Sequence, residues 1–152
     1  MSSSQTVLIT GCSRGLGLGL CKEYLNRGFQ VIATCRTPEK AAELSEVLTK
    51  YGQRPPLALD VSSLVSVEDC KDRIAKEISS IDVLVNNAGI SNKNHPDEMA
   101  TSVDPKEFTE VMNTNVTGIL AVTQAFIPLL KKGAISYRIR NPEWMFDQGN
   151  YW

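Results

Sequence analysis

The chain has 152 residues, of which 42% are hydrophobic and 22% charged, and its formal net charge is −1 at pH 7. This composition is typical of one ordinary globular domain and excludes disordered and collagen-like chains. The near-zero charge, without any block of Lys and Arg, argues against an electrostatic nucleic-acid binder and against a polybasic membrane anchor.

The cysteines and the single histidine give no sign of a metal centre. The four cysteines (Cys12, Cys21, Cys35 and Cys70) form no CxxC pair, and His95 is the only histidine. Because structural metal sites use closely spaced thiolates and imidazoles, we expect no metal. The cysteines are expected to be small buried thiols in a reducing compartment.

Two segments bear on targeting and on membranes. The first ten residues, MSSSQTVLIT, contain no basic residue and only a short apolar run, which is unlike a signal peptide. Residues 111–130 carry no charge, but Asn113, Asn115, Gln124 and Pro128 would be costly in hydrocarbon. We therefore expect a half-buried helix at 111–130 and a cytoplasmic protein.

Short apolar runs alternate with amphipathic segments over the first 130 or so residues. Strands are predicted at 6–10, 30–35, 57–61 and 82–85. Helices are predicted at 16–26 (with Leu16, Leu20 and Tyr24 on one side), from an N-cap at Thr37 with Pro38 as the first helical residue, from a Ser66–Asp69 capping pair, and from Asp104-Pro105 to about Leu130. Strands separated by such helices form a parallel sheet. The order β-α-β-α-β-α-β-α predicts an α/β fold, the nucleotide-binding half of a doubly wound, Rossmann-type sheet.

A glycine-rich loop joins the first predicted strand to the first helix. It reads Thr10-Gly11-Cys12-Ser13-Arg14-Gly15-Leu16-Gly17. Gly11 permits a tight turn, Gly15 lets the backbone approach a pyrophosphate, and Gly17 lets the helix pack close to the sheet. The N–H groups around Leu16 and the helix dipole favour an anion, so the loop predicts a dinucleotide site.

The end of the second strand indicates which dinucleotide is bound. An NAD site usually places Asp or Glu there to accept the ribose 2′-hydroxyl, whereas this strand ends in Arg36. Arg14 in the loop supplies a second cation, and two arginines suit a 2′-phosphate. We therefore predict NADP, with NADPH preferred over NADH. The alternative is that Arg36 is simply a solvated side chain at the end of a strand.

At this point the chain resembles the short-chain dehydrogenase/reductase family. The glycine loop has the family spacing, Asn86-Asn87-Ala88-Gly89 ends the fourth strand, Asn115 lies in the long helix, and Asp60-Val61 closes the third strand. The Ala-Thr-Cys-Arg ending of strand two is similar to NADPH-dependent carbonyl reductases of the sniffer or C-factor type. The resemblance implies an NADP-dependent oxidoreductase that transfers hydride to or from a carbonyl or alcohol.

The resemblance also implies roles for single residues. It assigns adenine contacts to Asp60 and Val61, and ribose contacts to Asn87, Ala88 and Gly89. It makes Asn115 the catalytic residue that holds a relay water. The helical spacing places Asn115 on an inward face with Phe108 and Phe126. The alternative is a core asparagine with satisfied hydrogen bonds.

The family's catalytic tyrosine is not found by its spacing. A tyrosine needs a nearby lysine to lower its pKa, and the family places the two as Tyr-x-x-x-Lys, together with a serine. None of the four tyrosines (Tyr24, Tyr51, Tyr137 and Tyr151) has a lysine four residues later. The chain is therefore predicted to bind the cofactor without turnover.

The composition changes abruptly near residue 133. Residues 133–152 read GAISYRIRNPEWMFDQGNYW and contain both tryptophans. We predict an incomplete NADP-binding domain at 1–132 and a divergent, aromatic-rich tail at 133–152. An alternative exon, a frameshift or a truncated gene would explain the change, and an evolved C-terminal segment is the alternative.

The resemblance further implies that the sheet lacks strand five onward. Residues 83–85 would then form an exposed, unpaired edge, unless residues 134–139 add a short strand there. Three functional hypotheses remain open at this point. They are an NADP-dependent oxidoreductase without turnover, a non-catalytic NADPH-binding or regulatory module that pairs with a full-length relative or with itself, and a non-functional truncated isoform.

Overall fold

The computed structural model describes residues 4–91, 104–130 and 139–140. The elements, in chain order, are β1 (Thr6–Ile9), α1 (Gly15–Asn26), β2 (Gln30–Cys35), the 3₁₀ turn η1 (Pro38–Lys40), α2 (Ala42–Lys50), β3 (Leu57–Ala58), α3 (Leu64–Ala75), β4 (Val83–Val85), α4 (Pro105–Met112), the π-helical segment η2 (Asn113–Thr117), α5 (Gly118–Leu130) and β5 (Ile139–Arg140).

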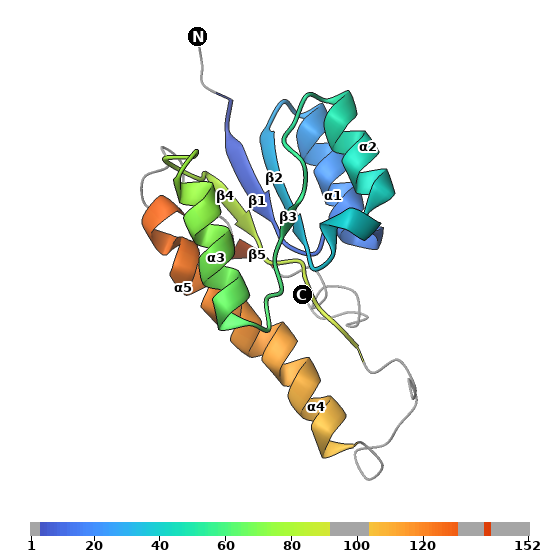
Figure 1. Ribbon diagram of the computed structural model, residues 1–152, viewed down its shortest axis with the longest axis vertical. Helices are drawn as coiled ribbons and strands as arrows, with labels where there is room; N and C mark the ends of the chain where they lie inside the picture. Colours follow the sequence, from blue (N-terminus) through green and yellow to red (C-terminus); the bar gives the residue numbers. More distant parts are fainter. Residues whose placement is uncertain (1–3, 92–103, 131–138, 141–152) are drawn as a thin grey trace, which may run out of the picture.

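A parallel sheet with the order β3-β2-β1-β4-β5 forms the centre of the molecule (Figure 1). β1 lies between β2 and β4, with Leu8 opposite Ile32 on one side and Leu84 on the other. The predicted α/β fold and the predicted order of strands and helices are confirmed. The third strand is shorter than expected, because only Leu57–Ala58 pair with β2.

Helices cover both faces of the sheet (Figure 1). Side chains of a strand alternate between the two faces, so Leu8 packs with α3 and α5 whereas its neighbours Val7 and Ile9 pack with α1 and α2. Leu8, Ile9 and Ile32 are fully buried. This burial on both faces explains why the strands are continuously hydrophobic in the sequence.

The structure shows which side of the first helix is buried, and it corrects the predicted start of the third. The buried face of α1 consists of Gly17, Leu18, Cys21 and Leu25, whereas Leu16 is 42% exposed and Leu20 and Tyr24 are only partly buried. The third helix begins at Leu64, because the hydroxyl of Ser63 accepts a hydrogen bond from the Ser66 N–H at 3.3 Å. Ser66 itself does not cap the helix; its hydroxyl accepts from the Asp60 N–H at 2.9 Å.

The uncharged segment 111–130 is part of a helix from Pro105 to Leu130 that has a π-helical turn inside it. Its N-terminus is as predicted, since the Asp104 carboxylate accepts from the Lys106 N–H at 2.8 Å. Phe126 is fully buried, but Phe108 is 56% exposed. The prediction that Phe108 lies on an inward face is therefore wrong, because α4 projects beyond the sheet and only α5 packs against it (Figure 1). Across the described residues, no helix has both the length and the apolar character that a membrane span requires.

At the edge of the sheet beside β4, the structure decides between the unpaired edge and the short added strand that the sequence had left open. β5 pairs with β4 in parallel, with Leu84 opposite Ile139 and Val85 opposite Arg140. The sheet therefore has a fifth strand, although it is only two residues long. It covers the part of this edge that Leu84 and Val85 form, where pairing gives partners to backbone N–H and C=O groups of β4.

Candidate functional site: a cleft at the carboxyl ends of the strands

A cleft of about 560 Å³ lies where β1, β2 and β4 end and α1 begins. Its walls are formed by the residues Gly11, Ser13, Arg14, Gly15, Leu16, Gly17, Cys35, Arg36, Thr37, Lys40, Leu59, Asp60, Val61, Asn87, Ala88, Gly89, Ile90 and Thr114. The structure thus brings together every residue predicted to bind the cofactor. Asn115 does not line the cleft, although its neighbour Thr114 does.

The glycine loop has the backbone geometry that its sequence predicts. Gly11 and Gly15 have φ angles of +71° and +56°, a region that side chains disfavour. At Gly17 there is no room for a side chain, because a Cβ atom would lie 2.2 Å from the Gly11 carbonyl oxygen. No side chain caps the first turn of α1, so its N–H groups face the cleft as a site for an anion.

Asn87 and Thr10 join the ends of β4 and β1 beneath the loop. The Asn87 amide donates to the backbone oxygens of Thr10 at 2.8 Å and of Gly11 at 3.1 Å. The Thr10 hydroxyl accepts from the N–H groups of Asn87 at 3.0 Å and of Ala88 at 2.9 Å. These buried bonds fix the loop against the sheet, so Asn87 has a structural role at the floor of the cleft.

The β2 side of the cleft is cationic. Arg14, Arg36 and Lys40 line the cleft from the loop, the end of β2 and the turn η1. The ion pairs that the described residues form use other cations, namely Lys22, Arg27, Arg54 and Lys71. No Asp or Glu of the β2–η1 segment lines the cleft. This side therefore suits an anion better than a bare ribose.

Sequence reasoning missed several of the lining residues, above all Lys40 and Thr37. Thr37 was predicted to be a helix cap, but it precedes a 3₁₀ turn, its side chain makes no capping bond, and α2 starts only at Ala42. The available signal was a third cation four residues after Arg36. No such signal marks the other missed residues, which are Cys35, Leu59, Ile90 and Thr114. They line the cleft because the folded backbone passes there, and not because of a recognisable residue type or spacing.

Asp60 and Val61 form the wall on the β3 side. The Asp60 Oδ1 atom accepts from the N–H and the hydroxyl of Ser62, at 3.0 and 2.6 Å. Its other oxygen, Oδ2, has no donor among the described residues. The backbone of Gly118 packs closely against Val61, since a Cβ atom at Gly118 would lie 2.8 Å from the Val61 carbonyl oxygen. The start of α5 thus positions this wall.

Asn115 contacts the cleft through another residue. Its Oδ1 accepts from the Ile90 N–H at 2.9 Å, and its Nδ2 donates to the Ile90 carbonyl at 2.7 Å. This pair of bonds ties the chain after β4 to the π-helical turn η2, a type of irregularity frequent at functional sites. In this arrangement Asn115 holds Ile90, which itself lines the cleft.

The cysteines near the cleft are neutral thiols. All four cysteines are buried, as predicted. Burial, followed by the neighbouring Cys21, raises the pKa of Cys12 well above its usual value. Burial also raises the pKa of Cys35, against a smaller lowering effect of the Thr37 N–H. Neither thiol is suited to act as a nucleophilic thiolate at neutral pH.

The described tyrosines lie away from the cleft. Tyr24 packs edge-on against Phe29, with ring centroids 5.0 Å apart, and Tyr51 is 40% exposed at the end of α2. Tyr137, Tyr151 and His95 lie outside the described residues. The cleft in the described part of the chain therefore contains no phenol that could act as an acid or base.

Comparison with known proteins agrees with this geometry. A model of the short chain dehydrogenase family matches residues 5–136. The chain is 40% identical over 136 residues to the NADPH-dependent pterin aldehyde reductase of Arabidopsis thaliana, covering 88% of this chain and 55% of that protein. It is 38% identical over 138 residues to an uncharacterised oxidoreductase of Schizosaccharomyces pombe, covering 87% of this chain and 51% of that protein.

A similar solved structure is the NADPH-bound carbonyl reductase from chicken fatty liver. It superimposes with a TM-score of 0.78 at 33% identity, over 86% of this chain and 53% of that chain. The chain thus spans about half the length of the relatives it matches. With the glycine loop, the strand order and the family match in agreement, the chain belongs to the short chain dehydrogenase family.

Proposed function

We propose that the chain binds NADP(H) in the cleft, through residues 1–132. The observation that carries this proposal is the meeting of an uncapped, glycine-rich helix start with Arg14, Arg36 and Lys40 along one cleft. An anion-binding helix start suits a pyrophosphate, and cations on the β2–η1 side, where no carboxylate of that segment lines the cleft, suit a 2′-phosphate. The NADPH named for the Arabidopsis and chicken relatives supports the same ligand.

Each wall has a part in this binding. The N–H groups at the start of α1 would hold the pyrophosphate, and Arg36 the 2′-phosphate. Oδ2 of Asp60 is available to accept from the adenine amino group, since Ser62 bonds only Oδ1. The small residues Ala88 and Gly89 leave room for a ribose. When bound, the cofactor supplies a hydride donor or acceptor, the chemistry of oxidoreductases in this family.

The proposal separates binding from turnover. No tyrosine of the sequence is followed by lysine at the family spacing, and the described part of the cleft offers no phenol. We therefore expect NADP(H) binding without reduction of a carbonyl substrate, with Asn115 as a remaining member of the family's catalytic set. A cytoplasmic location is part of the proposal, supported by four buried cysteines that form no disulfide.

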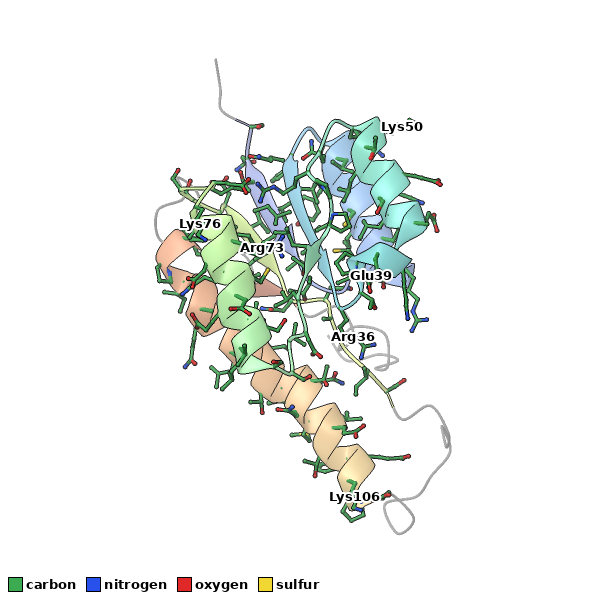
Figure 2. All side chains as sticks on the ribbon, in the orientation of Figure 1. Arg36, Glu39, Lys50, Arg73, Lys76 and Lys106 are labelled. Atoms are coloured by element: carbon green, nitrogen blue, oxygen red, sulfur yellow. The ribbon has the colours of Figure 1, made fainter. Side chains whose placement is uncertain are left out.

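Calorimetric titration of the purified chain with NADPH and with NADH tests this function. We expect micromolar affinity for NADPH and about tenfold weaker affinity for NADH, as expected for one lost charge-assisted contact. Arg36→Ala should remove most of this difference. Lys50→Ala is the matched control, since Lys50 lies at the opposite end of the β2–α2 unit from Arg36 (Figure 2). A soluble, folded chain that binds neither dinucleotide would exclude the proposed cofactor site.

A second candidate is association, with another copy or with a full-length relative. It is favoured by a row of exposed apolar side chains at four-residue spacing on α4, η2 and α5, namely Phe108, Met112, Val116 and Leu120, which are 40–56% exposed. Sedimentation of the chain should show a concentration-dependent dimer that Leu120→Glu abolishes and Thr109→Glu, off this row, does not. A monomer at all concentrations would exclude self-association.

A further inference from the structure

The hydroxyl of Thr37 is a polar group to which neither the fold nor the proposed function assigns a role. Thr37 lies between the end of β2 and the turn η1, in the position of a cap, yet its side chain makes no capping bond. The residue is exposed and lines the cationic side of the cleft. Its hydroxyl can therefore be reached by another protein when the cleft is empty.

The residues after Thr37 are those that a proline-directed protein kinase selects. The sequence reads Thr37-Pro38-Glu39-Lys40, with a proline directly after the threonine and a cation three residues after it. The groove of such a kinase offers no acceptor to the backbone N–H of the next residue, which favours proline because it has no N–H. Acidic groups of the kinase attract the cation. No other proline of the chain follows a serine or a threonine, so this motif occurs once.

The local backbone suits the extended shape that a kinase groove requires. Thr37 is already non-helical, with φ of −133° and ψ of 76°, as is usual for a residue before proline. Two backbone bonds of 3.0 Å close the turn, from the Lys40 N–H to the Thr37 carbonyl and from the Ala41 N–H to the Pro38 carbonyl. Opening so short a turn costs little compared with unfolding the sheet, because the packed part of the chain begins at the buried Ala41.

We propose that Thr37 is a phosphorylation site for a proline-directed kinase, and that its phosphorylation weakens the binding of NADPH. This inference rests on the proposed function and adds its regulation. In the transfer, the Thr37 Oγ1 atom forms a bond to the γ-phosphorus of ATP, and the bond from that phosphorus to the bridging oxygen breaks. ADP leaves, and the hydroxyl proton passes to a base of the kinase.

The attached phosphate would bring a charge of about −1.5 to −2 to the cationic side of the cleft. Thr37 is next to Arg36 in the chain and precedes the turn that ends in Lys40, and both cations line the cleft. They would pair with the attached phosphate in preference to that of a ligand, because the attached group has a high effective concentration. A 2′-phosphate entering the cleft would then meet a like charge instead of free cations.

The experiment treats the purified full chain with a cyclin-dependent kinase and ATP and then titrates it by calorimetry. Mass spectrometry of the intact chain should show one added phosphoryl group, and Thr37→Val should take up none. The phosphorylated chain should bind NADPH at least about tenfold more weakly than the untreated chain. Its affinity for NADH should change less than about threefold, since NADH has no 2′-phosphate. Removal of the phosphate by a protein phosphatase should restore the binding of NADPH.

Pro38→Ala is the matched control, because it keeps the Thr37 hydroxyl and removes the residue that the kinase selects. Pro38 itself does not line the cleft. After the same treatment, this variant should carry no phosphate and bind NADPH as strongly as before the treatment. Thermal melting of every form checks that it is folded.

The outcomes separate this inference from the proposed function. If the untreated chain binds no NADPH, the proposed function fails. If the untreated chain binds NADPH but the kinase does not modify Thr37, or if the phosphorylated chain binds NADPH with unchanged affinity, only the present inference is overturned. Equal losses of NADPH and NADH affinity would also overturn it, since they would show a distortion of the whole cleft rather than competition between two phosphates.

Discussion

Gly17 illustrates how one residue can determine the shape of the cleft. A Cβ atom there would meet the Gly11 carbonyl oxygen at 2.2 Å and the Asn87 amide at 2.5 Å, both of which belong to the rigid floor of the site. Neither group can move without breaking the bonds between β1 and β4. The close approach of α1, and hence the position of its N–H groups, depends on the absence of a side chain.

Gly17→Ala should therefore lower the melting temperature and abolish NADPH binding. Gly19→Ala is the matched control on the same helix, because a Cβ at Gly19 meets nothing within 4 Å. Alanine is the better helix former, so Gly19→Ala should stabilise the chain by about 0.5–1 kcal/mol. Thermal denaturation and NADPH titration of both variants measure this contrast. Equal melting temperatures for the two would contradict the tight packing at Gly17.

The buried thiol of Cys70, also a single-residue feature, should make the free energy of unfolding depend on pH. Burial raises the pKa of the Cys70 thiol to about 11, against a smaller lowering effect of Arg73. Above about pH 9 the unfolded chain loses this proton and the folded chain keeps it, so the free energy of unfolding should fall as the pH rises. The fall has an upper limit of about 1.4 kcal/mol per pH unit for this group and ends near pH 11.

Urea denaturation at about pH 8 and about pH 10 would measure this fall. Cys70→Ala should show a smaller decrease between the two pH values than the unaltered chain, although its stability at the lower pH is reduced by the cavity. The same decrease in both proteins would show that the Cys70 thiol does not contribute.

At the scale of elements, the π-helical turn η2 couples the long helix to the cleft. Asn115 holds Ile90 through two hydrogen bonds, and Gly118 at the start of α5 lies against Val61. The helix therefore positions Val61, in the connection after β3, and Ile90, in the connection after β4, although these two connections are distant in sequence. Without the π turn, a regular α-helix would rotate the residues that follow Asn115 about the helix axis relative to the residues that precede it.

Asn115→Ala should reduce the free energy of unfolding by about 1–3 kcal/mol, because both backbone groups of Ile90 lose their partner. NADPH affinity should fall as well, since Ile90 lines the cleft. Asn113→Ala, which removes a single exposed bond of 3.3 Å to Ser62, is the control and should cost less. Urea denaturation and NADPH titration measure both effects. The predicted decrease in the free energy of unfolding without any change in NADPH affinity would restrict Asn115 to a purely structural role.

For the whole molecule, the position of the cleft follows from the topology. β1 is central, the chain leaves it for β2 on one side, and β4 returns on the other. The helices after β1 and β4 therefore lie on opposite faces of the sheet, which leaves a crevice at the carboxyl ends (Figure 1). Ligands of open α/β sheets bind at this switch point because no connection crosses it.

Ligand binding should accordingly stabilise the fold as a whole. NADPH at about one hundred times its dissociation constant should raise the free energy of unfolding by about 2.7 kcal/mol, since the unfolded chain has no cleft. Thermal denaturation should show a higher melting temperature with NADPH than with NADH at equal concentration. Arg36→Ala should reduce the NADPH shift to that of NADH. An unchanged melting temperature with NADPH would contradict binding to the folded state.

Sequence patterns predicted the fold better than the packing of single helices. The strands and the glycine loop could be located because apolar runs and glycines are local signals, and the structure brings Gly11, Arg36 and Asp60 into one cleft. Phe108 was placed on an inward face although it is exposed, because periodicity alone does not say where a helix ends its contact with the sheet. Lys40 was missed because it approaches the cleft through a 3₁₀ turn that the sequence had presented as a helix start.

The sequence by itself determined the α/β class, the order of strands and the chemistry available at their ends. These depend on backbone preferences and on burial patterns that act over a few residues. Only the tertiary structure decided that Lys40 and Thr37 face the cleft, that Asn115 bonds to Ile90, and that β5 pairs with β4. Some of these features are contacts between segments that are distant in sequence, and the others depend on an irregular turn. All of them arise only when the packed core fixes the relative positions of the segments.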